Sequence, residues 1–234
     1  MSLELTTETA TLKRAAAEKS LEFIQDGNIV GLGTGTTVRY LLEALAVRVK
    51  EGLRIQGVPT SRSTAALATE LHIPILSDDE AWDIDVAIDG ADEVDPHFNL
   101  IKGGGGALLR EKIIASTAKK FVVIVDHAKL VTVLGSSFPL PVEVTPFGWP
   151  NTVRQIEHLG YQASPRQRDG KLFVTDNQNY ILDLHGGTIS NPWGLTQQLN
   201  AIPGVVENGL FVGLTSALVV ASPQGISVRR SPAE

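Results

Sequence analysis

The stretch Asn28–Lys50, NIVGLGTGTTVRYLLEALAVRVK, decides the fold class that the sequence predicts. Residues 28–32 are mostly apolar and indicate a short buried strand, and residues 33–37, GTGTT, indicate a glycine-rich turn. From residue 38 to residue 50 the apolar side chains recur at helical spacing. Strand, turn and helix in this order open an α/β unit, in which parallel strands alternate with helices.

The turn Gly33–Thr37 matches neither of two common nucleotide-binding loops. A dinucleotide-binding GxGxxG that starts at Gly31 would need glycine where Thr36 stands, and the Gly-Lys pair of a Walker A loop is missing. The turn does direct backbone N–H groups and hydroxyls to the start of a helix, which suits a single phosphate or carboxylate. An ordinary strand-to-helix turn capped by threonine explains the same residues, so both interpretations stay open.

Further alternation supports a parallel sheet. We expect strands over residues 53–58, 84–88 and 121–125, and helices over residues 11–25, 61–70 and 107–118. Strands that end at Leu32, Ile88 and Val125 would bring three polar loops to one edge of the sheet, where open α/β sheets bind ligands.

The sequence changes in character near Gly135. Shorter elements are expected there, with strands within residues 139–147, 172–175 and 180–184 and helices over residues 152–160 and 191–199. The expected fold is therefore α/β, a Rossmann-like, mostly parallel sheet flanked by helices, with a second, smaller α+β domain. We assign residues 1–134 and 207–234 to the first domain and residues 135–206 to the second.

Composition excludes several classes of protein. Of the 234 residues, 43% are apolar and 20% are charged, which is typical of a globular protein. The net charge of −6 argues against a nucleic-acid partner, because a phosphate backbone requires clustered Lys and Arg. No apolar run is long enough to span a membrane, and the first residues do not resemble a signal peptide. With no cysteine, thiolate metal sites are excluded, and we expect a cytoplasmic protein.

The stretch Asp89–Glu111, DGADEVDPHFNLIKGGGGALLRE, concentrates the candidate chemistry. Its glycines can expose N–H donors to a close ligand, although a flexible linker is the alternative. Its acids could hold a metal through oxygen ligands, but the spacing is not that of an EF-hand, and Lys102 supplies a cation without a metal. On these residues alone, both a metal site and a site that works without a metal stay open.

Glu111 has apolar residues three and four positions away on the predicted helix. Arg110, Glu111 and Lys112 together span about 200° of the helix, too wide an arc for one solvated face. A carboxylate in apolar surroundings has its pKa raised, which brings a general base closer to neutral pH. Pairing with a basic neighbour at a partly exposed helix end is the alternative for Glu111.

Several segments resemble the ribose-5-phosphate isomerase A family in the same order along the whole chain. They are GLGTGTT, DGADEVD, LIKGGGGALLREK, Asp126–Lys129, FPLPVEVTPFG, VTDNQNYILDLH and AIPGVVENGLF. The resemblance implies interconversion of D-ribose 5-phosphate and D-ribulose 5-phosphate through an enediolate, without metal or organic cofactor. It also implies a two-domain subunit in a homodimer or homotetramer, with a sugar phosphate as the small-molecule partner.

Site residues follow from the same resemblance, position by position. Glu111 is similar to the family's proton-transferring base, and Asp89, Asp92 and Lys102 resemble the groups that assist ring opening and stabilise oxygen charge. Substrate contacts are implied at Lys13, Thr34, Gly35, Thr36, Thr37, Gly90, Ala91, Gly103, Gly104, Gly105 and Lys129. Thr36 stands where the family usually has serine, and its hydroxyl is retained.

Two other functions remain to be weighed. A non-catalytic sugar-phosphate sensor on a related fold would bind the ligand without converting it, and the complete set of acids and lysine argues for the enzyme. A nicotinamide-dependent dehydrogenase would need the glycine fingerprint that Thr36 interrupts.

Overall fold

The structure is a computed structural model that describes residues 2–231, with side chains from residue 7 onward. Contacts divide the chain into two compact units. Unit 1 comprises Met1–Ala91, Arg110–Lys129 and Leu214–Glu234, and unit 2 comprises Asp92–Leu109 and Leu130–Gly213. The boundaries expected from the sequence stay a prediction, and this division differs from them chiefly by assigning Asp92–Leu109 to unit 2.

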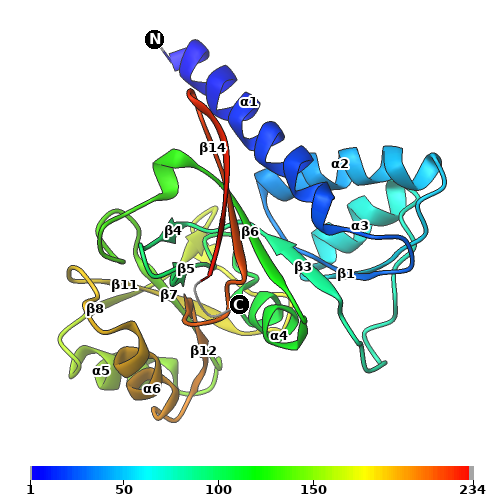
Figure 1. Cartoon of the computed structure of the whole chain (residues 1–234). Coiled ribbons are helices and arrows are strands. Elements are labelled where there is room, and N and C mark those ends of the chain that lie inside the picture. Colours follow the sequence, from blue (N-terminus) through cyan, green and yellow to red (C-terminus); the bar gives the residue numbers. More distant parts are fainter. Residues whose placement is uncertain (1, 232–234) are drawn as a thin grey trace. The chain divides into compact units, whose positions relative to one another are not determined.

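Unit 1 is built on a six-stranded sheet with the order β15-β14-β6-β3-β1-β2 (Figure 1). Its strands are β1 (Ile29–Leu32), β2 (Gln56–Pro59), β3 (Val86–Asp89), β6 (Phe121–Asp126), β14 (Ala217–Ser222) and β15 (Gly225–Arg230). All neighbouring strands are parallel except the terminal β14–β15 hairpin. The order β6-β3-β1 confirms that the strands ending at Leu32, Ile88 and Val125 lie side by side, so their carboxyl ends share one edge.

The helices of unit 1 pack on both faces of this sheet. They are α1 (Ser2–Ser20), α2 (Thr36–Lys50), α3 (Arg62–Glu70) and α4 (Leu108–Thr117), with short 3-10 turns η1 (Leu21–Phe23) and η2 (His127–Lys129). Val30 and Leu32 point into a core formed with α1 and α2. Gly31 points to the other face, where an added Cβ would lie 2.5 Å from Ile114 Cγ2 of α4. Alternate strand residues therefore contact different helical layers, which is why these strands are apolar throughout.

Unit 2 contains smaller, mostly antiparallel sheets. A four-stranded sheet has the order β12-β7-β11-β8, a three-stranded sheet the order β13-β5-β4, and β9 pairs with β10. The strands are β4 (Glu93–Val94), β5 (Leu100–Ile101), β7 (Leu140–Val144), β8 (Gln162–Pro165), β9 (Gln167–Arg168), β10 (Lys171–Leu172), β11 (Tyr180–His185), β12 (Val205–Asn208) and β13 (Leu210–Phe211). Helices α5 (Trp149–Glu157) and α6 (Pro192–Asn200) contribute Ile156, Leu195 and Leu199 to its core.

Most predicted elements are present, with shifted ends. The α/β class with a mostly parallel sheet is confirmed, as are the strands at β1, β3 and β6. The first helix begins at Ser2 rather than near Thr11, and the strand predicted over residues 172–175 is limited to β10 and a bridge at Val174. The short strands β4 and β5 were not predicted. No helix among residues 2–231 is long and apolar enough to cross a membrane.

Candidate active site

The loop Gly33–Thr37 joins β1 to α2 at the carboxyl edge of the unit 1 sheet. Its hydroxyls are already organised, because Thr34 Oγ1 lies 2.7 Å from Thr60 Oγ1 and donates to Ser61 Oγ at 2.9 Å. Lys13 Nζ of α1 donates to Thr36 Oγ1 at 2.9 Å, so this lysine contacts the loop. In the sequence, only the family resemblance had linked Lys13 with these loop residues. The start of α2, three threonines and one lysine cation together suit an anion.

Asp89 ends β3 and is almost fully buried, with 3% of its surface exposed. Its Oδ1 accepts hydrogen bonds from Thr34 N at 3.0 Å and from Gly90 N at 2.8 Å. A Cβ on Gly33 would lie 2.2 Å from the same oxygen, so any side chain there would displace the Asp89 carboxylate. Gly33 is therefore glycine because the Asp89 carboxylate occupies the space of a side chain.

An open cleft of about 570 Å³ borders the same loop. Thr34, Gly35 and Thr36 form one wall, and Ser63 and Thr64 of α3 contribute to another. Ser61 caps α3, because its side chain accepts a hydrogen bond from Thr64 N at 3.0 Å. Lys13, Asp89 and Glu111 do not line this cleft, so the candidate site residues that line it all belong to the threonine loop, Gly33–Thr37.

Glu111 lies in the first turn of α4 and is 6% exposed. Of its two charged neighbours, Arg110 lies 3.4 Å from Asp78 Oδ2, and Lys112 is half-buried. One turn further along, Ile114 packs against β1 at Gly31. The charged arc predicted that at least one of these three residues leaves the solvated face, and the structure shows that Glu111 is the buried one.

The other unit 1 candidates occupy the ends of β3 and β6. Gly90 and Ala91 follow Asp89 directly, and both are half-buried. Lys129 closes η2, the turn after β6, and is also half-buried. Asp126 Oδ1 accepts from Ala128 N at 3.0 Å and so fixes that turn. Direct contact of Lys129 with a substrate stays a prediction.

In unit 2, Lys102 precedes the glycine loop, Gly103–Gly106, and Asp92 contacts it. Asp92 Oδ2 accepts from Gly104 N at 2.8 Å, and Lys102 is 2% exposed with Nζ 5.5 Å from the centre of the Phe211 ring. Gly106 N donates to Gly103 O at 3.0 Å. Two of the four glycine N–H groups are therefore bonded within the chain, which corrects the expectation that the whole run presents bare donors.

Arg166 holds the glycine loop and was not predicted from the sequence. Its Nη1 donates to Gly103 O at 2.7 Å and to Gly104 O at 3.1 Å. Asp183 of β11 orients the guanidinium through bonds to Nε at 2.9 Å and Nη2 at 2.5 Å. The planar guanidinium holds two carbonyls of the loop, and Asp92 holds the N–H group of Gly104, so the loop has little conformational freedom. A lone arginine between short strands carries no sequence signal for this role.

Glu93 was considered from the sequence only among the acids that could hold a metal, and its structural role was missed. It is fully buried, and its carboxylate accepts from Gly135 N, Ser137 N, Ser137 Oγ and Phe138 N at 2.6–2.8 Å. The Phe138 ring in turn covers the glycine loop, since a Cβ on Gly104 would lie 3.0 Å from Phe138 Cζ. Glu93 therefore fixes the loop that packs on Gly104. Its position beside Asp92 in an acidic stretch was the available clue.

Comparison with known proteins gives consistent matches. Residues 56–225 match the family described as ribose 5-phosphate isomerase A (phosphoriboisomerase A). The chain is 51% identical over 228 residues to "Ribose-5-phosphate isomerase A" of Cereibacter sphaeroides, covering 94% of this chain and 91% of that protein. The protein of the same name from Bradyrhizobium diazoefficiens is 48% identical over 234 residues, covering 94% and 97%. A solved D-ribose-5-phosphate isomerase in complex with phospho-erythronic acid is 42% identical, with a TM-score of 0.91 over 94% of this chain and 98% of that one.

Proposed function

We propose, since this chain belongs to the ribose 5-phosphate isomerase A family, that it interconverts D-ribose 5-phosphate and D-ribulose 5-phosphate with Glu111 as general base. The observation that carries the activity is the identity of about half of the residues over nearly the whole chain. The burial of Glu111 supports its role, because a carboxylate with little access to water is suited to remove a carbon-bound proton.

The chemistry proceeds on the open-chain sugar. The Glu111 carboxylate takes the C2 proton, a C1–C2 double bond forms, and the negative charge moves to the C1 oxygen. The hydroxyl proton on the C2 oxygen passes to the C1 oxygen, and Glu111 returns its proton to C1. The C2 carbonyl of the ketose forms, and the carboxylate is restored, so no proton or electron is gained or lost.

Asp89, Asp92 and Lys102 are the groups we assign to ring opening and to the oxygen charge. Lys102 is almost fully buried, and an ammonium group removed from water would stabilise an enediolate oxygen more strongly than a solvated one. Asp92 and Asp89 are three residues apart in sequence, so their Cα atoms lie within about 11 Å. The similar enzyme of known structure is in complex with phospho-erythronic acid. The carboxylate of this compound is a planar group with two oxygens and so resembles the planar enediolate, in which the two oxygens are on adjacent carbons.

The substrate phosphate is assigned to the threonine loop with Lys13. Thr34, Gly35, Thr36 and Thr37 supply N–H groups and hydroxyls at the start of α2, and Lys13 is already bonded to Thr36. Gly90, Ala91, Gly103, Gly104, Gly105 and Lys129 complete the proposed contacts. We also propose a cytoplasmic homodimer or homotetramer, which light scattering after size-exclusion chromatography would measure as two or four times 25.0 kDa.

Replacing Glu111 by Gln tests the assignment, with activity followed as ribulose 5-phosphate formed in the presence of EDTA. We expect kcat to fall by about 10²–10⁴-fold with little change in KM, because only proton transfer is removed. Glu157→Gln, on the exposed face of α5, is the matched control and should retain wild-type turnover. Wild-type turnover in Glu111→Gln would refute the base, and binding without product in the wild type would favour a sensor.

A further inference from the structure

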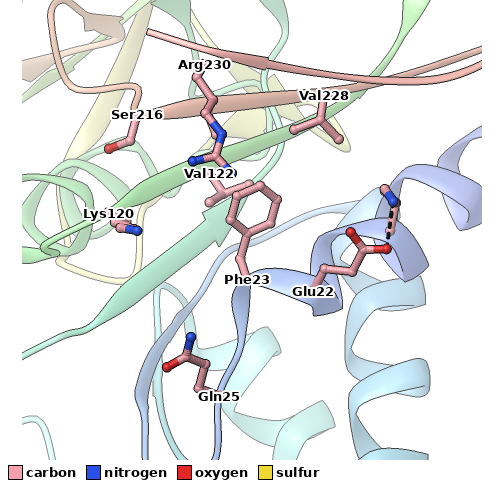
Figure 2. A pocket seen from close by; sticks show the side chains of 10 residues that line it. Glu22, Phe23, Gln25, Lys120, Val122, Ser216, Val228 and Arg230 are labelled. Carbon is pink, nitrogen blue, oxygen red and sulfur yellow. Dashed lines mark hydrogen bonds and ion pairs between the residues drawn. The ribbon is translucent and has the colours of Figure 1, made fainter. Parts of the chain in front are cut away.

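A second cleft lies in unit 1, at the amino ends of the parallel strands. Its volume is about 480 Å³, and its walls come from the end of α1, η1, and the strands β6, β14 and β15 (Figure 2). Val122 and Ala217, at the starts of β6 and β14, form its floor. Asp89 and the threonine loop follow the carboxyl ends of β3 and β1, so this cleft is at the opposite edge of the same sheet.

The strand register explains why Arg230 faces this cleft. Val122 pairs with Ala217, and Ala217 pairs with Arg230, so the three residues form one row across β6, β14 and β15. Paired residues on adjacent strands point to the same face of a sheet. Val122 and Ala217 face the core that includes α1, and Arg230 must therefore extend over the same face. Arg229, one position earlier, points to the other face and does not line the cleft.

Charge is unevenly distributed in this cleft. Its walls carry Lys19, Lys120 and Arg230 but only one acid, Glu22, in a chain of net charge −6. Glu22 is bonded to Lys19 at 2.6 Å, the contact drawn as a dashed line in Figure 2. Among residues 7–231, no ion pair is found for Lys120 or Arg230. Two cations therefore face one cleft without a counter-charge, which favours binding of an anion.

Lys119 provides the contrast. It is adjacent to Lys120 in sequence and is neutralised by Asp85 Oδ1 at 2.7 Å. Lys120 points into the cleft instead, where Phe23 and Val228 supply apolar surface beside the cations. Figure 2 shows Phe23 and Arg230 extending into the cleft from different walls. A guanidinium, an ammonium and an aromatic face together suit a phosphate ester that carries an organic group.

We propose that this cleft is a second binding site, for a small organic phosphate whose phosphate is held by Arg230 and Lys120 and whose organic part lies against Phe23. The site is independent of the proposed isomerase chemistry, because it uses none of the residues assigned to that reaction. Free phosphate and phosphate esters can both bind to Arg230 and Lys120. Only an ester has an organic part that contacts Phe23.

The test uses pyridoxal 5′-phosphate, a phosphate ester whose aldehyde forms an imine with a neighbouring lysine. Borohydride reduction fixes the imine, and mass spectrometry of peptides gives the labelling of each lysine separately from any label at the isomerase site. We expect Lys120 to be labelled at least about tenfold faster than Lys50, an exposed lysine of α2, because a held phosphate raises the local aldehyde concentration. Excess inorganic phosphate should remove that difference.

Variants of neighbouring arginines make the result specific. Arg230→Gln should lower Lys120 labelling about tenfold, the effect of losing one charge-assisted hydrogen bond, whereas Arg229→Gln should leave it unchanged. Phe23→Ala should weaken protection by a phenyl phosphate ester more than protection by inorganic phosphate. The proposal is overturned if Lys120 and Lys50 are labelled equally, or if the two arginine variants behave alike. Equal protection by both anions in Phe23→Ala and wild type would refute the aromatic contact and the ester assignment.

Discussion

Replacing Arg166 by Met tests how firmly the glycine loop is held. The change removes four hydrogen bonds, two to the carbonyls of Gly103 and Gly104 and two to Asp183. It retains an apolar stem of similar length, so lost packing contributes little. The Asp183 carboxylate is left without its partner in a position where the two side chains are only 14% and 16% exposed.

The expected loss in free energy of unfolding is about 2–4 kcal/mol. Breaking a fully buried ion pair by removing one partner costs about 3–5 kcal/mol, and the remaining access to water reduces that figure here. Removing both partners in Arg166→Met/Asp183→Leu should recover about half of the loss, because no orphan carboxylate remains while the two carbonyls still lack a donor. We also expect kcat to fall about 10–100-fold if the loop contacts the substrate, since small misplacements near reacting atoms are costly.

The measurement is urea unfolding, with turnover determined on the same samples. Arg168→Met is the matched control, because Arg168 lies 4.5 Å from the centre of the Phe173 ring on an exposed strand and should contribute about 0.5–1 kcal/mol. If Arg166→Met loses no more stability than Arg168→Met, the loop is not held by the guanidinium. Full stability in Arg166→Met with reduced kcat would likewise contradict the geometric reasoning.

Two further predictions concern unit 1. Gly33→Ala should destabilise the protein by about 1–3 kcal/mol and displace the Asp89 carboxylate, because the new Cβ would lie 2.2 Å from its Oδ1. Gly90→Ala is the control, since its Cβ would lie 3.8 Å from the nearest atom, Ile124 O, and equal unfolding midpoints of the two variants would contradict this prediction. The Asp85 side chain has its pKa lowered by the hydrogen bond from Lys119 and by that from Ile29 N. A lowered folded pKa stabilises the protein, and this stabilisation is complete above the unfolded pKa near 3.9 and is lost as pH falls through the lower folded pKa. The advantage of wild type over Asp85→Asn at pH 7 should therefore begin to fall near pH 4 and vanish at lower pH. A difference in unfolding free energy that is constant over that pH range would refute the role of the Asp85 charge.

The sequence predicts the parallel sheet because apolar periodicity and turn residues are local signals. The segment at residues 28–50 contains its own strand, turn and helix, and the structure differs from the prediction by only one or two residues at each end. The same holds for β6, whose apolar run is buried on both faces. The width of the charged arc on α4 predicted that one of its three charges is buried, and only the structure identifies that residue as Glu111.

The contacts of unit 2 are less predictable because they join residues distant in sequence. Arg166 meets Gly103 across 63 positions, and Glu93 meets Ser137 across 44. The strands β4, β5 and β13 are two residues long, too short for any periodicity to register. The glycine run was interpreted as a row of donors, yet two of its N–H groups bond to Asp92 and Gly103, because only the folded loop shows where each donor points.

The contact between Gly31 and Ile114 has a consequence for the proposed base. Ile114 follows Glu111 by three residues on α4, and Gly31 leaves no room for a methyl group beneath Ile114 Cγ2. The absence of a side chain at Gly31 therefore determines how closely α4 packs on β1. It also determines the distance of the Glu111 carboxylate from the sheet. Gly31→Ala should move α4 away from the sheet. It should therefore lower kcat as well as the free energy of unfolding, and a variant with unchanged kcat would disprove this coupling. The position of the proposed catalytic carboxylate can thus be altered by a substitution at a residue that has no side chain.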